Sequence, residues 1–173
     1  MSAAGRPVAE EPTALVIVDH GSRRAASNAM HEEFVAEFAA RAGDAYVAVE
    51  PAHMELAEPT VAEAVDRAVA AGARRVMVMP YFLFPGTHWE RDIPALVAAA
   101  AERHPGVEML VTAPVGLHPS MHTVVRERVE QCARHADGGD ACALCADTDR
   151  CHWATAPSPS PGEAPDPNEV SEA

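Results

Sequence analysis

Four cysteines near the carboxyl end and two histidines upstream are the residues of this sequence best suited to chemistry. Three of the cysteines lie in one short segment, Cys142, Cys145 and Cys151, and Cys132 precedes them on an expected helix. A Cys-x-x-Cys pair with a third thiol nearby is compatible with a structural zinc or with an iron–sulfur cluster, and the spacing does not choose between them. In a reducing compartment, such close spacing favours a metal over disulfides.

A separate imidazole site is indicated by His20 and His88, which both follow expected strands. A neutral histidine nitrogen can hold a divalent metal ion, and after the metal has left it can accept a proton near neutral pH. A carboxylate such as Glu55 can orient a histidine ring of this kind. These three residues therefore predict a site at which a divalent metal is exchanged for protons.

The elements that must position these residues follow an alternating pattern. Apolar, β-rich runs alternate with Ala-rich segments of helical period, which is typical of βαβ units. We expect strands at 14–19, 46–50, 75–83 and 108–113. We expect one helix capped by Ser22 or Ser27, and three more at 59–72, 92–103 and 119–135. The sequence thus predicts an α/β fold with a four-stranded parallel sheet flanked by helices.

Ligands of open parallel sheets bind outside the carboxyl ends of the strands, so the segments with His20, Glu55 and His88 should face one cleft. The first helix should bury an apolar face that includes Met30, Phe34, Val35 and Phe38. Length and composition, 173 residues and 48% hydrophobic, suit a single folded domain. We expect a flexible N-terminus, the domain, a cysteine-rich loop and a disordered Pro-rich acidic tail, at 1–13, 14–137, 138–153 and 154–173.

The charge of the chain excludes some partners. The formal net charge is -13, and residues 154–173 contain four acidic residues and no basic one. A surface of this sign repels phosphate backbones, so we expect no nucleic-acid partner. Residues 1–12 are polar rather than a cationic leader, and the apolar run 14–18 is too short to span a bilayer. We therefore expect a cytoplasmic protein without membrane contact.

Four stretches together resemble a known family. They are Asp19-His20-Gly21-Ser22-Arg23, the run 51–59 around His53-Met54-Glu55, the run 82–89 that ends in His88-Trp89, and Thr112-Ala113-Pro114. With these stretches, residues 14–153 resemble the small CbiX or SirB type of sirohydrochlorin chelatase, which places iron or cobalt in the precursor of siroheme or cobalamin. The resemblance implies a chelatase-like α/β fold and a homodimer that brings two half-sites together.

The resemblance also assigns roles. It implies that His20 and His88 bind the incoming metal and take up the ring protons, with Glu55 assisting. The cysteine segment resembles plant-type sirohydrochlorin ferrochelatases, which implies a [2Fe-2S] cluster on Cys132, Cys142, Cys145 and Cys151 and favours Fe²⁺ as the substrate metal. Two alternatives stay open: a cobaltochelatase that inserts Co²⁺, and a metal or tetrapyrrole carrier without turnover.

The carboxylates of sirohydrochlorin call for a locally positive site, for which we select Arg23, Arg24 and Arg91 from their positions near the loop ends. Arg23 could instead pair with a nearby glutamate, and Glu55 could be an acid that interacts with a helix dipole. We assign no role to His53, and we expect His31 to be a surface or capping residue, like five further histidines: His104, His118, His122, His135 and His152.

Overall fold

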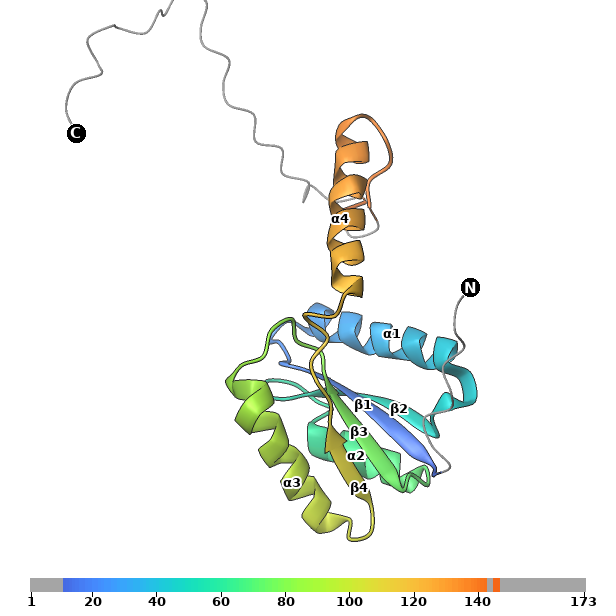
Figure 1. Cartoon of the computed structure of the whole chain (residues 1–173), viewed down its shortest axis with the longest axis vertical. Helices are drawn as coiled ribbons and strands as arrows, with labels where there is room; N and C mark the ends of the chain where they lie inside the picture. Colours follow the sequence, from blue (N-terminus) through green and yellow to red (C-terminus); the bar gives the residue numbers. More distant parts are fainter. Residues whose placement is uncertain (1–10, 143–144, 147–173) are drawn as a thin grey trace, which may run out of the picture. The chain divides into compact units, whose positions relative to one another are not determined.

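The computed structural model describes residues 11–142 and 145–146 of the chain (Figure 1). The chain divides into two compact units, Met1–His122 and Thr123–Ala173. The boundary falls inside the last helix, α4 (Ser120–Ala136), whereas we expected the folded domain to run to residue 137. The predicted flexible N-terminus, apart from residues 11–13, and the predicted tail lie outside the described residues, so these domain limits stay predictions.

The first unit contains a four-stranded sheet in the order β2-β1-β3-β4. Every strand pairs in parallel with its neighbour, which confirms the predicted α/β fold. The strands are β1 (Thr13–Asp19), β2 (Ala48–His53), β3 (Arg75–Pro80) and β4 (Glu108–Val111). The helices between them are α1 (Ala25–Ala42), α2 (Val61–Ala70) and α3 (Ile93–Arg103), with short helical turns η1 (Gly43–Ala45) and η2 (His88–Asp92).

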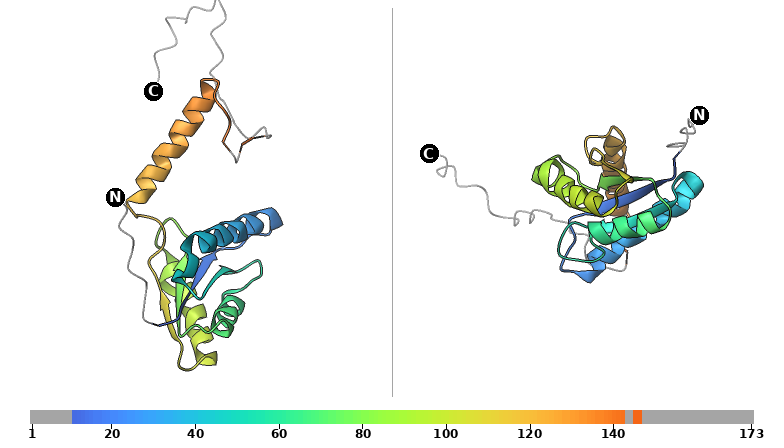
Figure 2. Two further views of the ribbon diagram at one scale, coloured as in Figure 1. Left: turned by 90° about the vertical axis from the view of Figure 1, so that its right-hand side faces the viewer. Right: turned by 90° about the horizontal axis from the view of Figure 1, so that it is seen from below.

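Helices cover both faces of the sheet. Figure 2 shows α1 on one side and α2 and α3 on the other. Because side chains alternate along a strand, Val16 and Val18 of β1 pack toward α2 and α3, while Leu15 and Ile17 pack toward Val35 of α1. β1 is buried along almost its whole length, as a central parallel strand should be.

The strand boundaries differ most from the prediction at the ends of β2 and β3. β2 continues through Pro51 to His53, because an edge strand tolerates a proline whose missing N–H would point away from the ladder. β3 ends at Pro80 rather than at residue 83. The Tyr81 N–H still donates to the Val18 carbonyl at 2.7 Å, but β1 ends one residue later and offers nothing further to pair with.

The helix starts also differ in detail. Arg24 is the N-cap of α1, and no side chain caps it, so neither Ser22 nor Ser27 has the predicted role. Val35 of the predicted apolar face is buried and Phe38 packs against the same cluster, whereas Met30 is 55% and Phe34 38% exposed, and His31 is buried as well. α2 begins after Thr60, which forms a capping box with Glu63, rather than at residue 59.

The packing of α3 against the sheet generates a first prediction. Ile93 is fully buried in the larger of the two apolar clusters. The substitution Ile93→Ala should lower the free energy of unfolding by about 2–5 kcal/mol, because it removes buried methyl groups and leaves a cavity. Denaturant titration of both variants measures the effect. The control Met30→Ala, at a position 55% exposed, should change stability by less than about 0.5 kcal/mol; equal losses in the two variants would contradict this packing.

Candidate metal-binding site at the carboxyl ends of the strands

His20 follows directly after β1, and its ring has two polar neighbours. The Nδ1 atom lies 3.2 Å from the Gly21 carbonyl oxygen, and the Nε2 atom lies 3.3 Å from Oε1 of Glu55. Both neighbours are acceptors, so a neutral ring donates to only one of them; with its hydrogen on Nδ1, toward the Gly21 carbonyl, the ring has its lone pair on Nε2. The His20 side chain is 43% exposed, so this lone pair is accessible to a ligand.

His88 begins η2, a π-helical turn that leads into α3. Its Nδ1 atom lies 2.9 Å from Oδ2 of Asp92, which is on the next turn of the same helix. The carboxylate accepts from Nδ1–H, and the lone pair of the neutral ring is again on Nε2. The ring also stacks on Phe82, with centroids 6.1 Å apart, and the neighbouring Trp89 donates its indole N–H to the Thr112 carbonyl at 2.9 Å.

The structure brings these two histidines together. The ring centroids of His20 and His88 are 5.3 Å apart, in an edge-to-face arrangement. Glu55 and Asp92, the carboxylates beside the two rings, both line a cavity of about 440 Å³ whose other walls are Met54, Ala95 and Leu96. The site is therefore a pair of imidazoles, each with its own acid, at the edge of one open cleft.

Asp92 is a functional candidate that the sequence analysis missed. The Arg91 guanidinium, at 2.9 Å, and then the His88 ring hold the pKa of the Asp92 carboxyl below its usual range. Asp92 is thus an anion at neutral pH and remains one as the pH falls, until its lowered pKa is reached. The i, i+4 spacing of His88 and Asp92 at a helix start was the signal in the sequence that could have revealed this pair.

The three predicted arginines have different surroundings. Arg23 and Arg24 are exposed in the loop between β1 and α1. Arg91 is 75% exposed and pairs with Asp92. All three lie on segments that follow β1 or precede α3, next to the histidine pair, and their role toward a substrate stays a prediction.

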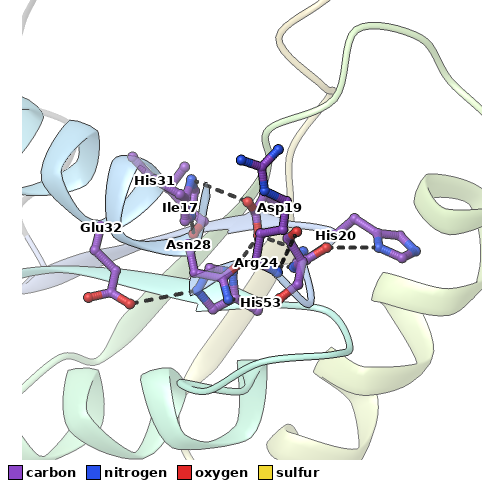
Figure 3. Close-up of polar contacts among 10 residues, drawn as sticks. Ile17, Asp19, His20, Arg24, Asn28, His31, Glu32 and His53 are labelled. Atoms are coloured by element: carbon purple, nitrogen blue, oxygen red, sulfur yellow. Dashed lines mark hydrogen bonds and ion pairs between the residues drawn. The ribbon is translucent and has the colours of Figure 1, made fainter. Parts of the chain in front are cut away.

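Two histidines were placed wrongly or left without a role. His31 is buried rather than on the surface, and its Nε2–H donates to the Ile17 carbonyl at 3.1 Å. His53 is fully buried at the end of β2 and contacts Asp19, as Figure 3 shows. No sequence pattern indicates this group of His31, His53 and Asp19, because the three residues come from three separate elements.

The cysteines belong to the second unit. Cys142 is buried, Cys145 is half-buried and Cys132 is exposed on α4, while Cys151 lies outside the described residues. The Cys142 carbonyl accepts N–H groups of Cys145 and Ala146 at 2.9 and 2.8 Å, so one tight turn contains two of the thiols. A turn of this kind with soft sulfur ligands fits an iron–sulfur or zinc site in its donor chemistry.

Within residues 11–142 and 145–146, no three histidine, cysteine or acidic side chains are already arranged around a point that could hold a metal ion. A metal ion held by the histidine pair would therefore need further ligands from outside this part of the chain. In the same part of the chain, none of the helices is long and apolar enough to cross a bilayer.

The fold and the site together define a class, α/β proteins with an imidazole pair at the carboxyl edge of a four-stranded parallel sheet. Residues 14–132 match the CbiX family, and the chain belongs to this family.

Two relatives and one solved structure extend the match. The chain is 51% identical over 138 residues to the chloroplastic sirohydrochlorin ferrochelatase of Arabidopsis thaliana, with 79% of this chain and 60% of that protein aligned. It is 32% identical over 117 residues to a sirohydrochlorin cobaltochelatase of Priestia megaterium, covering 68% of this chain and 37% of that protein. The chain thus spans less than two thirds of the length of each.

The solved structure is the sirohydrochlorin chelatase SirB from Bacillus subtilis subspecies spizizenii in complex with cobalt. Its TM-score is 0.64 at 28% identity, and the match covers 69% of this chain and 50% of that chain. This similarity confirms the chelatase-like fold that the sequence predicted.

The Asp92–His88 pair generates a second prediction. In Asp92→Ala the His88 Nδ1–H loses its acceptor, so the neutral ring should shift toward the tautomer with the hydrogen on Nε2. Nitrogen-15 NMR of the imidazole rings measures the two tautomers directly. Asp92→Asn, whose amide oxygen still accepts, and Arg91→Ala should both keep the original tautomer. An unchanged tautomer in Asp92→Ala would show that the carboxylate does not orient the ring.

Proposed function

We propose that this protein is a sirohydrochlorin ferrochelatase, which inserts Fe²⁺ into sirohydrochlorin in siroheme biosynthesis. The observation that supports it most directly is the pair of imidazoles at 5.3 Å, each with a neighbouring carboxylate. The 51% identity to the Arabidopsis ferrochelatase supports the substrate and the metal.

The geometry suits the proton balance of the reaction. Insertion of a divalent metal into the macrocycle releases two ring N–H protons, and each of the two imidazoles can take one. His20 and His88 present Nε2 lone pairs that bind Fe²⁺ first and accept protons after the metal has passed to the ring nitrogens. Glu55, 3.3 Å from the His20 Nε2, then accepts a hydrogen bond from the protonated ring.

The alternatives share this site. A cobaltochelatase of cobalamin biosynthesis would use the same residues, because imidazole and carboxylate bind both Fe²⁺ and Co²⁺. The cobaltochelatase relative is 32% identical, and the cysteine segment adds weight to iron. A metal or tetrapyrrole carrier would keep the histidines but release no metallated product.

We include substrate binding and assembly in the proposal. Arg23, Arg24 and Arg91 would bind the carboxylates of sirohydrochlorin; their exposure, a few residues along the chain from His20 and His88, supports this. A homodimer would cover the open cleft and the exposed apolar side chains of the loop after β3, of which Leu83 is 56% and Phe84 70% exposed. The cytoplasmic location stays a prediction, since the name of the Arabidopsis relative places that protein in the chloroplast.

We further propose a [2Fe-2S] cluster on Cys132, Cys142, Cys145 and Cys151. The four thiolates match the usual ligand set of such a cluster, and the tight turn at Cys142 supports a compact site. When bound, the cluster would supply one-electron redox chemistry. It would lie apart in sequence from the residues to which we assign metal insertion, so that step is derived without it.

A turnover assay tests the main proposal. Sirohydrochlorin and Fe²⁺ are supplied anaerobically in large excess over the protein, with Co²⁺ in parallel, and absorbance follows the metallated ring. Many rings metallated per chain are expected, and His88→Ala should lower the rate by about 100-fold or more, because it removes a metal ligand and a proton acceptor. The matched control is His122→Ala, an exposed histidine, which should keep the full rate.

Two other outcomes would redirect the proposal. A spectral change that stops at one ring per site would mean a carrier. Faster turnover with Co²⁺ than with Fe²⁺ would favour the cobaltochelatase.

The cluster has its own test. Protein purified anaerobically should contain iron and acid-labile sulfide in equal amounts and show the visible absorption of a [2Fe-2S] centre, and Cys142→Ser should lose all three signals. The exposed Ser27→Ala serves as the control for handling losses. Zinc without iron or sulfide in the purified protein would replace the cluster with a structural zinc site.

A further inference from the structure

A polar cluster around two buried histidines lies at the same edge of the sheet as the histidine pair and takes no part in the proposed metal insertion. It consists of Asp19 at the end of β1, His53 at the end of β2, and His31 and Glu32 of α1. His53 is fully buried and His31 is 6% exposed. Figure 3 shows the His53 ring between Asp19 and Glu32, while the His20 ring points away from the cluster.

One carboxylate oxygen of Asp19 receives two hydrogen bonds. The His53 Nδ1 lies 2.6 Å from Oδ1 of Asp19, and the Gly21 N–H donates to the same oxygen at 2.8 Å. Because a carboxylate only accepts, the His53 Nδ1 is the donor. The two donors come from opposite sides of the site, one from the end of β2 and one from the residue after His20.

These bonds join the two loops that hold the site. The Asp19 carbonyl accepts from the Met54 N–H at 2.8 Å, and the His20 carbonyl accepts from the Glu55 N–H at 3.2 Å. The loops are so close that a Cβ atom on Gly21, whose φ is +80°, would collide with the Glu55 carbonyl oxygen. If the Asp19–His53 hydrogen bond is lost, the two loops therefore have little free space in which to rearrange. The spacing of His20 and Glu55 should then change.

The second nitrogen of the His53 ring lacks a hydrogen bond within the described part of the chain. Its Nε2 is the buried side-chain atom without a hydrogen-bond partner in the described part of the chain, and Oε1 of Glu32 lies 3.9 Å away. An unpaired buried polar atom destabilises a fold, and an apolar ring of similar size would avoid that loss. The hydrogen bond from the His53 Nδ1 to Asp19 is the contribution of this histidine that an apolar ring could not make.

We propose that His53 is a positioning residue: through Asp19 it fixes the loop of His20 against the loop of Glu55, and thereby sets the affinity of the site for a divalent metal. It contacts neither the metal nor the macrocycle. The effect on metal affinity rests on the proposed function, but the positioning of the two loops by His53 does not depend on it.

The test uses the full chain and separates position from stability. His53→Phe keeps a ring and removes the donor, while His53→Asn places an amide N–H where Nδ1 was. In His53→Phe, hydrogen exchange at the Gly21 and Glu55 amides should be about tenfold faster or more, with the β1 amide of Val16 unchanged and the thermal midpoint equal or higher. His53→Asn should return the two exchange rates toward those of the parent chain.

The second readout is metal affinity, with Co²⁺ alone as the probe, followed by its visible absorption. His53→Phe should weaken Co²⁺ binding by about tenfold, and His53→Asn should restore most of it. Glu32→Gln is the matched control on the other side of His53, and it should leave both exchange and Co²⁺ binding as they are. If His53→Phe does not fold, His53→Met takes its place.

The outcomes distinguish this inference from the proposed function. Unchanged exchange at Gly21 and Glu55 in a folded His53→Phe would overturn the positioning role, whatever the enzyme does. Faster exchange in a protein whose parent form turns over no sirohydrochlorin would uphold the positioning of His20 and reject the chelatase.

Discussion

The parallel direction of all four strands is the constraint on which the rest of the molecule depends, because it delivers every strand end to one edge of the sheet. β1 lies between β2 and β3 and is buried on both faces, so its register fixes theirs. The backbone bonds continue beyond the strands: Met54 N–H to the Asp19 carbonyl and Tyr81 N–H to the Val18 carbonyl. The loops that hold His20 and Glu55 are therefore an extension of the ladder.

At that edge the balance between stability and function changes. The two faces of the sheet are filled by valines, alanines and isoleucines that need only to exclude water. The carboxyl edge contains the buried His31 and His53 and also Gly21, whose φ is positive. Among the described residues, the His53 Nε2 has no hydrogen-bond partner. Departures of this kind from local rules concentrate at functional sites, where the surrounding fold compensates for them.

The sequence predicted what depends on period and composition. Alternating runs located the four strands, and the residues after β1 and β3 located His20 and His88. The sequence-based prediction failed where contacts between distant parts of the chain decide the structure. β2 continues past its expected end at residue 50, because an edge strand accommodates Pro51, and Ser27 lies inside α1 instead of capping it. The sequence analysis overlooked Asp92 although its i, i+4 spacing from His88 was a usable signal, whereas the contact of His53 with Asp19 joins two separate strands that only the folded chain brings together.

The presence of one carboxylate beside each imidazole has an electrostatic consequence. Glu55 and Asp92 give the empty site two negative charges, which a divalent ion on the two neutral rings would cancel. When that ion leaves and each ring holds a proton, the two positive charges of the ion are replaced by those of the two imidazolium rings, while the Arg91 guanidinium beside Asp92 contributes the same charge to both states. The metal-loaded and the protonated states would therefore have the same total charge. The exchange of metal for protons would then leave no additional uncompensated charge in the cleft, which surroundings of low dielectric constant would penalise.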